Sequence, residues 1–552
     1  MKKNIFTAAI FFIFVHAILG QVTQEWAKSF TNGNYFDTGY KVRVDAQGNV
    51  YVIGDSYSGS NTESYNGILL KYNNAGILQW SKVYNGPANN EDFFRDIDID
   101  KDGNIYIAGA VTLSGTTKDA LLLKYNSSGT LLWSQTYNGA ATLDDYAMDM
   151  EIDTLGNIYI AGGSSRGVNN NDALIIKYNS SGGFLWANKY NGSGNASDFA
   201  DEIKLDKNGN AVIMGTTTST SSTKEDYLII KYGPDGTEQW VQKYNGSGNN
   251  FDTPSGIVID NSQNIFVTGS TTGAGTLTDV TTLKYSPSGV LQWAKTYDGP
   301  AVNYDNGYAI ALDSTGNVIC AGASSGIGSN RDCLVLKYNT SGTLMWEARY
   351  NGPNNSSDAL FTLSVDKFGN IYTAGYCGVN NVVWDDYVTI KYNSTGVQQW
   401  NVRYNGNGNS SDQALGICLD ASNNLYVTGQ TWGTSSTNWD ITTIKYSQLV
   451  SVYQQSNFIP DNFSLSQNYP NPFNPTTKID FDLPFESKVT ISIYDMTGRE
   501  VMTLLNGDLK TSGYYTMNIN ASALSSGTYF YTMKAEGGNN NFVQTKKMML
   551  VK

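Results

Sequence analysis

Aspartates at a fixed spacing are the side chains of this sequence best suited to metal or acid–base chemistry. Seven times an aspartate stands twelve residues after a tryptophan, and near the N-terminus Asp37 stands one residue out of this spacing. Carboxylate oxygens are ligands that Ca²⁺ prefers, and they also attract cationic ligands. The candidate metal ligands are Asp92, Asp145, Asp198, Asp252, Asp305, Asp358 and Asp412.

A second acidic set recurs with the same period. An aspartate that opens a loop also accepts hydrogen bonds from the backbone amides of that loop. We favour this structural role for both sets, because the residues recur whatever the loop sequence, whereas a specific site would break the symmetry. No cofactor is predicted, and Ca²⁺ is the metal that the residues would suit. The second set is Asp119, Asp172, Asp226, Asp279, Asp332, Asp386 and Asp440, with Asn66 at the first position.

The only histidine, His16, lies in an apolar N-terminal segment. If that segment is removed, Ser-His-Asp and Cys-His nucleophile arrangements and histidine-ligated zinc sites are excluded. Paired carboxylates remain compatible with glycosidase or lyase chemistry. Enzymatic activity is therefore left open, and the sequence favours its absence.

Three tryptophans, Trp384, Trp432 and Trp439, stand outside the regular spacing of the others. Exposed aromatic side chains in loops suit stacking on sugars or contact with a protein. The alternative is that they cover the edge of a sheet. These three residues are the candidate ligand-binding residues.

A repeat of 53 or 54 residues must position all of these side chains. Each unit contains four short β-type runs separated by turn residues, for example 131–137, 146–153, 157–161 and 173–178. Four antiparallel strands per unit, repeated eight times, are typical of a β-propeller. The tryptophans that mark the units are Trp26, Trp80, Trp133, Trp186, Trp240, Trp293, Trp346 and Trp400.

The phase of the repeat predicts how the propeller closes. The chain begins with a lone strand around Trp26, and the last unit ends at Lys445-Tyr446 without its partner strand. Pairing the first strand with the last unit would remove two open sheet edges. We therefore expect an eight-bladed ring closed by its N-terminal strand, with both acidic sets on the face where the first and third strands of each blade begin.

The repeat resembles the SBBP-type β-propeller repeats of secreted bacterial proteins. The likeness covers residues 22–449 and runs through Gly156–Tyr159, Lys177-Tyr178 and Trp186, with small departures at Ser262–Phe266 and Asn423–Tyr426. The hairpin is also similar to the tryptophan-docking repeats of quinoprotein dehydrogenases. That second likeness concerns blade packing and implies no cofactor site.

The C-terminal segment, 463–552, carries a different pattern. It closely resembles the type A sorting domain of type IX secretion substrates. The resemblance implies a small Ig-like β-sandwich that directs passage across an outer membrane and is usually cleaved, often leaving the passenger on surface lipopolysaccharide. The residues between, 450–462, are expected to form a linker. The matching motifs are Asn468–Pro472, Ile493–Asp495, Gly498–Val501, Leu524–Tyr529 and Lys546-Lys547.

Residues 1–20 have the basic start and short apolar core of a secretory signal peptide. No later stretch has the roughly 20 apolar residues of a transmembrane helix. The net charge of −13 disfavours nucleic acid, whose binding needs clustered Lys and Arg. The expected partners are the type IX machinery and an extracellular glycan or protein, and the expected location is outside the cell or on its surface.

Two further patterns concern packing. Just before the turn aspartate, the first four units carry charged residues and the last four mostly small ones, which predicts ion pairing between blades in one half and close packing in the other. Cys320 and Cys333 fall on successive strands, so they either pair across the strands or are small buried thiols, as we favour.

Together these patterns predict an all-β, exported protein. We expect a non-enzymatic scaffold that binds a glycan or a protein through its loop-bearing face. The alternatives are an extracellular carbohydrate-active enzyme that uses aspartates on that face and a purely structural component of the cell surface.

Overall fold

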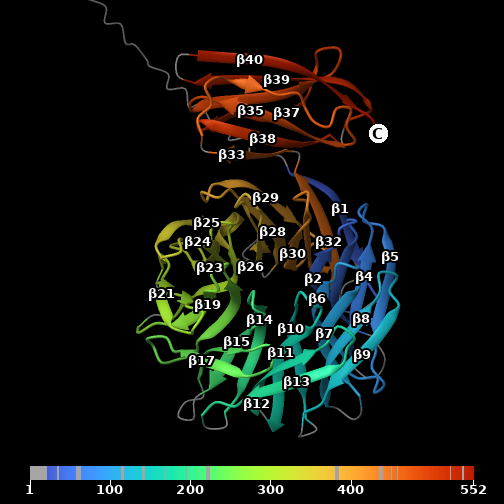
Figure 1. Cartoon of the computed structure of the whole chain (residues 1–552), viewed down its shortest axis with the longest axis vertical. Coiled ribbons are helices and arrows are strands. Elements are labelled where there is room, and N and C mark those ends of the chain that lie inside the picture. The colour runs from blue at the N-terminus through green and yellow to red at the C-terminus, as the bar shows by residue number, and fades with distance from the viewer. Residues whose placement is uncertain are drawn as a thin grey trace, which may run out of the picture. The chain divides into compact units, whose positions relative to one another are not determined.

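The computed structural model of the chain describes residues 22–33, 36–57, 64–113, 117–139, 143–167, 170–193, 196–218, 224–275, 277–301, 303–379, 384–433, 439–448, 450–456, 458–521, 524–537 and 540–552. The expected signal peptide, 1–20, lies outside them. The chain divides into two compact units, Gln24–Ser447 and a second one that includes Gln448–Lys552. Both consist of β-strands, which confirms the all-β prediction (Figure 1).

In the first unit, the described residues form eight four-stranded sheets, numbered 1 to 8 in chain order below. Consecutive strands within a sheet run antiparallel, with short turns between the third and fourth strands. One sheet is composite, because β1 pairs with β32 of sheet 8. A 3-10 helix, η1 (Pro353–Asn355), lies between sheets 6 and 7 in the chain.

Sheets 1 to 4 consist of β2 (Asp37–Val44), β3 (Val50–Tyr57), β4 (Tyr65–Tyr72) and β5 (Leu78–Tyr84); β6 (Phe93–Ile99), β7 (Ile105–Thr112), β8 (Lys118–Tyr125) and β9 (Leu131–Tyr137); β10 (Asp145–Ile152), β11 (Ile158–Gly167), β12 (Asn170–Tyr178) and β13 (Phe184–Tyr190); and β14 (Asp198–Leu205), β15 (Ala211–Thr218), β16 (Glu225–Tyr232) and β17 (Glu238–Tyr244).

Sheets 5 to 8 consist of β18 (Thr253–Ile259), β19 (Ile265–Thr272), β20 (Thr278–Tyr285) and β21 (Leu291–Tyr297); β22 (Asp305–Leu312), β23 (Val318–Ser325), β24 (Arg331–Tyr338) and β25 (Leu344–Tyr350); β26 (Asp358–Val365), β27 (Ile371–Gly378), β28 (Asp385–Tyr392) and β29 (Gln398–Tyr404); and β30 (Asp412–Leu419), β31 (Leu425–Trp432) and β32 (Trp439–Gln448) with β1 (Val22–Phe30).

The hydrophobic core of this unit is divided into clusters that lie between consecutive sheets. The second strands are apolar on both faces, as in Ile105–Thr112, because each central strand packs against a neighbouring sheet on either side. One cluster joins distant parts of the chain, with Trp26 and Tyr426 of sheet 8 beside Val42 and Tyr72 of sheet 1. The buried apolar side chains of this unit therefore pack mainly between neighbouring sheets.

A tryptophan on the fourth strand of one sheet clamps the turn of the next sheet. The Trp240 Nε1 donates to the Pro287 carbonyl at 3.2 Å, and Lys231 Nζ donates to the same oxygen at 3.3 Å. The indole covers Gly289, where a Cβ would lie 2.8 Å from the ring and where φ is +83°. A glycine is therefore required there for both space and backbone conformation.

The same tryptophan clamp recurs along the chain. Trp186, Trp293 and Trp346 donate to turn carbonyls of the following sheet at 3.2–3.3 Å. Trp26 on β1 donates in the same way to the Asn74 carbonyl in the β4–β5 turn, at 3.1 Å. Sheet 8 is thus clamped to sheet 1 by the same kind of contact that joins the internal sheets.

The second unit contains two four-stranded sheets around one hydrophobic cluster. One sheet has the order β33 (Val450–Ser456), β38 (Gly513–Asn520), β35 (Thr476–Leu483), β34 (Ser464–Leu465), and the other β37 (Glu500–Lys510), β36 (Ser487–Tyr494), β39 (Gly527–Gly537), β40 (Asn540–Leu550).

One expectation from the sequence, and one alternative that it left open, differ from the structure. Part of the expected linker, Val450–Ser456, is strand β33, which pairs with β38 and so covers a sheet edge that would otherwise be open. Cys320 and Cys333 do not face each other, because their cross-strand partners are Leu336 and Ala323. Both thiols are free and buried, as the favoured alternative predicted.

Replacement of Trp240 by alanine tests the clamp. We expect the free energy of unfolding to fall by about 3 kcal/mol, since a large side chain and its packing contacts are removed. The matched control is Trp384→Ala, which removes a tryptophan that is 48% exposed and should change stability by less than about 0.5 kcal/mol. Urea unfolding measures both, and equal losses would contradict the clamp.

Candidate functional site

The aspartates that follow each tryptophan begin the first strands or, as Asp92 and Asp252 do, immediately precede them, and all are buried, with 1% or less of each exposed. Asp252 illustrates their contacts: Oδ2 accepts from Gly246 N at 2.5 Å and Oδ1 from Thr272 N at 2.8 Å. The carboxylate thereby ties the Tyr-Asn-Gly loop to the second strand. The equivalent loop donors to the other six are the amides of Gly86, Gly139, Gly192, Gly299, Gly352 and Gly406.

Burial also affects the protonation of these groups. It raises the pKa of Asp358 to about 6 and that of Asp412 to about 7, although the backbone donors oppose the shift. Carboxylates held in this way are acceptors for their own loops. The geometry therefore supports the hydrogen-bonding role for this set.

The second acidic set begins the third strands, and several members have cationic partners. Arg166 Nε lies 2.5 Å from Asp172, and Arg349 lies 2.9 Å from Asp332. These pairs bring the carboxylate charge close to a guanidinium, which favours a role in the local structure.

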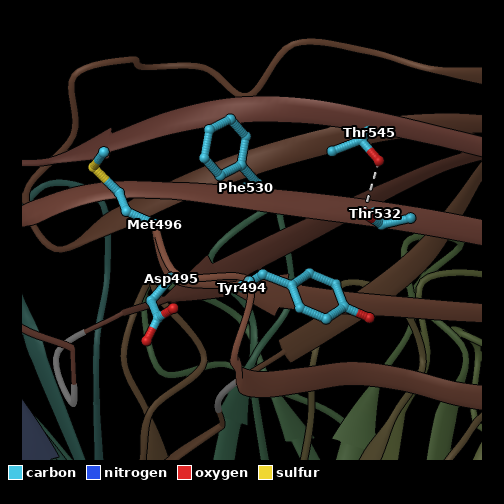
Figure 2. Close-up of a pocket in the computed structure, with 7 residues that line it drawn as sticks. Tyr494, Asp495, Met496, Phe530, Thr532 and Thr545 are labelled. Atoms are coloured by element: carbon cyan, nitrogen blue, oxygen red, sulfur yellow. Dashed lines mark hydrogen bonds between the residues drawn. The ribbon is translucent and has the colours of Figure 1, made fainter.

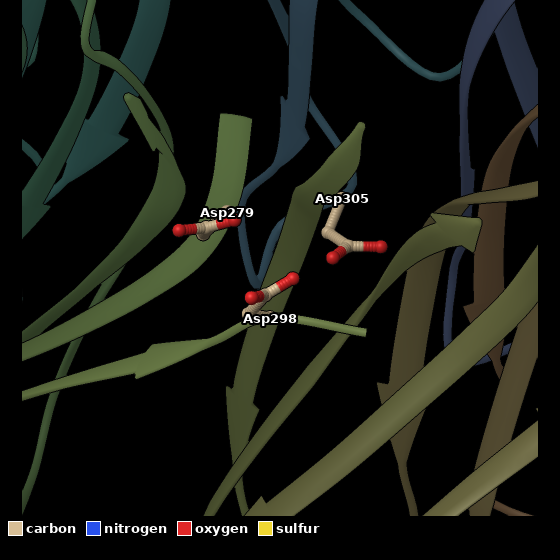
Figure 3. Close-up of side chains that lie close together, drawn as sticks. All are labelled: Asp279, Asp298 and Asp305. Carbon is tan, nitrogen blue, oxygen red and sulfur yellow. The ribbon is translucent and has the colours of Figure 1, made fainter. Parts of the chain in front are cut away.

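One set of three carboxylates departs from the repeat. Asp279, Asp298 and Asp305 each offer one oxygen, and these oxygens lie within 4.8 Å of one another (Figure 3). Asp298 stands where the other internal repeats have the asparagine of Tyr-Asn-Gly. In sheet 2 that asparagine, Asn138, donates a hydrogen bond to Asp119. The cluster is the place where these residues could hold a divalent cation, and the replaced asparagine is the sequence signal that reveals it.

Charged side chains on the first strands of sheets 1 to 4 form a network. Lys41 Nζ lies 3.1 Å from Asp96 and 3.5 Å from Asp149, and Lys204 Nζ lies 2.8 Å from Glu151. Although burial acts in the opposite direction, Lys204 and Lys41 lower the pKa of Asp149. The predicted ion pairing between sheets is therefore confirmed in this half of the unit.

The three unusual tryptophans lie on two sheets. Trp432 and Trp439 face each other across β31 and β32, with ring centroids 5.4 Å apart and planes at 78°. Trp384 precedes β28 of sheet 7, and its side chain is exposed. Trp384 thus lies in the loop before β28, whereas Trp432 ends β31 and Trp439 begins β32, so the edge-to-face pair lies on the strands. The remaining loop residues, 380–383 and 434–438, lie outside the described residues.

An open pocket of about 380 Å³ lies on the second unit (Figure 2). Tyr494, Met496, Phe530 and Thr545 are among its lining residues, on and beside β36, β39 and β40. Thr532 and Thr545 share a 2.8 Å hydrogen bond at its wall. All of its lining residues belong to the second unit.

Comparison with known families agrees with both resemblances of the sequence. Residues 467–551 match the secretion system C-terminal sorting domain, and residues 239–275 match a β-propeller repeat of the SBBP family. The chain therefore carries an SBBP repeat and a type IX sorting domain. It is a secreted protein with β-propeller repeats, exported by type IX secretion to the cell surface or the extracellular space.

Individual relatives are distant. An uncharacterized WD repeat-containing protein, L264, of Acanthamoeba polyphaga mimivirus is 24% identical over 406 residues, which is 65% of this chain but 25% of the relative. A catalytically inactive virginiamycin B lyase from Staphylococcus aureus, solved with quinupristin, is 10% identical, covers 77% of this chain and 99% of its own, and has a TM-score of 0.39. A protein of unknown function from Dyadobacter fermentans has the same identity and coverage, with a TM-score of 0.37.

These likenesses carry no argument about activity. The sorting domain implies contact with the secretion machinery. In the described part of the chain, no helix is long and apolar enough to cross a membrane.

Replacement of Asp298 by asparagine tests the three-carboxylate cluster. Without divalent cations we expect the free energy of unfolding to rise by up to about 1 kcal/mol, because an amide donor replaces a third negative charge. Thermal unfolding in chelator-treated buffer measures the change. The reverse result, a less stable variant together with a wild type stabilised by millimolar Ca²⁺, would instead assign a cation to the cluster.

Proposed function

We propose that the eight sheets are the blades of a closed β-propeller spanning residues 22–449, followed by a sorting domain at 463–552. The first strands support the ring, because each contacts the next: β2, β6, β10, β14, β18, β22, β26 and β30, and β30 contacts β2 again. The Trp26 clamp and the cluster around it support closure between sheets 8 and 1.

Two hydrogen bonds between sheets 1 and 8 support the same closure. Thr38 Oγ1 of sheet 1 donates to Gln430 of sheet 8 at 2.9 Å, and Lys445 Nζ of sheet 8 donates to the Asn74 carbonyl of sheet 1 at 3.4 Å. In this arrangement the first strands are innermost. The loops before the first and third strands then lie on one face of the ring, which we call the loop-bearing face.

We further propose that this exported propeller is a non-enzymatic scaffold that binds a glycan or a protein on its loop-bearing face. The observation that carries this proposal is the exposed Trp384 before β28 of sheet 7, together with the Trp432–Trp439 pair on sheet 8. Indole rings contribute large contact areas to sugars and proteins at little entropic cost. A glycosidase needs carboxylates available for proton transfer, whereas the first acidic set is engaged by backbone amides.

Alanine replacement of the three tryptophans tests this function. We expect Trp384→Ala, and the double change Trp432→Ala with Trp439→Ala, each to weaken binding by about tenfold, or 1.4 kcal/mol, through loss of aromatic contact. Binding is measured on an array of neutral and acidic glycans, and with surface proteins from the producing culture.

Leu155→Ala is the control, because Leu155 is 80% exposed in a turn that opens toward the opposite face. Unchanged binding in both the Trp384→Ala variant and the Trp432→Ala, Trp439→Ala double variant would remove this region of sheets 7 and 8 from the site. Polysaccharide turnover abolished by a single aspartate change would replace the scaffold with the enzyme.

A further inference from the structure

Aromatic side chains gather where the first strands begin, at positions that the repeat otherwise leaves variable. In each first strand the register with the second strand shifts near its start, for example between Ala147 and Asp149. Such a bulge adds one residue and turns its side chain away from the sheet pairing. Six half-buried aromatic residues stand at the bulge or two residues before it, and we call them the inner rim. Tyr40, Tyr308 and Phe361 are bulge residues, and Phe93, Tyr146 and Phe199 stand two residues before a bulge.

Four of these rings form one continuous arc over sheets 1 to 4. Phe93 stacks on Tyr146 with centroids 6.0 Å apart and planes at 17°, and Tyr146 meets Phe199 at 6.3 Å. The Arg95 guanidinium lies 4.2 Å from the Phe93 centroid and 4.9 Å from that of Tyr40. The strands β2, β6, β10 and β14 are consecutive neighbours (Figure 1). The arc therefore follows the inside of the proposed ring.

A second aromatic group lies on sheets 6 and 7. The centroids of Tyr308 and Phe361 are 5.4 Å apart, and Phe361 is 5.4 Å from Tyr376. Arg331 donates to the Tyr376 hydroxyl at 3.5 Å. Tyr308 and Phe361 are bulge residues like Tyr40, whereas Phe93, Tyr146 and Phe199 stand two residues before their bulges.

Hydrogen-bonding groups occupy sheets 7, 8 and 1 between the two aromatic groups. Thr38 donates to Gln430 at 2.9 Å, Gln430 to Gln413 at 3.3 Å, and Gln413 to Asp385 at 3.5 Å. On sheet 4, Asp201 follows Phe199 by two residues and is exposed. Aromatic faces thus alternate with amides and carboxyl groups.

The charges of the rim disfavour an anionic ligand. The Arg95 guanidinium is 2.9 Å from the buried Asp55 carboxylate, so its charge is already compensated. The protein as a whole carries −13, which opposes polyanions. Aromatic faces suit the apolar faces of sugar rings, and amide and carboxyl groups suit their hydroxyls.

We propose that the inner rim binds a neutral oligosaccharide, whose pyranose faces lie against the Phe93–Tyr146–Phe199 arc and the Tyr308–Phe361 pair. This inference rests on the proposed function and names both its ligand class and a second part of the loop-bearing face. It differs from the tryptophan loops in the residues involved, so the two are tested separately.

The test uses the full exported chain with Tyr146→Leu and Tyr308→Leu combined. Leucine keeps apolar volume and removes the ring faces. The matched control is Tyr65→Leu, which changes an exposed tyrosine at the start of a third strand that is not one of the six rings of the inner rim. Thermal unfolding checks that each variant folds: each must melt at a temperature similar to that of the wild type.

Isothermal titration calorimetry is carried out with neutral hexasaccharides of glucose, mannose and xylose, and with hexagalacturonate as the anionic probe. The expected result is that a neutral hexasaccharide binds the wild type and Tyr65→Leu alike, and binds the double variant at least about tenfold more weakly.

Three results would overturn the proposal: equal binding by the double variant, preference for hexagalacturonate, or no binding of any neutral hexasaccharide. If the double variant binds normally while Trp384→Ala does not, the inner rim is excluded and the proposed function stands. If both variants bind normally, both proposals fail. If the double variant does not fold, Phe199→Leu with Phe361→Leu repeats the same comparison.

Discussion

The tryptophan clamp is the contact on which the rest of the propeller unit depends. An indole from one sheet covers a glycine in a turn of the next, and its N–H and a neighbouring lysine share one carbonyl of that turn, as Trp240 and Lys231 share that of Pro287. Each contact therefore sets the position of a whole neighbouring sheet. The apolar clusters between sheets follow from this position of one sheet against the next, and so does the nearly constant length of the repeat, 53 or 54 residues.

Because regular positions maintain the sheets, function is expected where the repeat is broken. The buried aspartates tie loops to strands and are used in the same way in each sheet, as Asp252 shows. Asp298, Trp384 and the aromatic arc at Tyr146 have no such repeated duty. A symmetric scaffold with an asymmetric loop-bearing face is consistent with an exported binding protein, since the sorting domain supplies only the route out of the cell.

The strands, the composite sheet with β1 and the sorting domain were predictable, because each depends on local patterns such as alternation, turn residues and a short motif. The inner rim was not predictable. The bulge before Asp149 redirects one side chain, and its direction depends on pairing between strands, which periodicity alone does not encode. The same limit applies to β33. Its polar sequence predicts a linker, and only its pairing with β38, which is distant in the sequence, makes it a strand.

The central claim is that the N-terminal strand closes a ring of eight blades through Trp26. Amide hydrogen exchange of Trp26→Ala in the native state tests it most directly, because the clamp from β1 to Asn74 is the contact removed. The account predicts faster exchange in β2 and β30–β32, at both sides of the closure, and unchanged exchange in sheets 4 and 5. Faster exchange confined to β1, with β2 and β30 fully protected, would contradict closure by this strand.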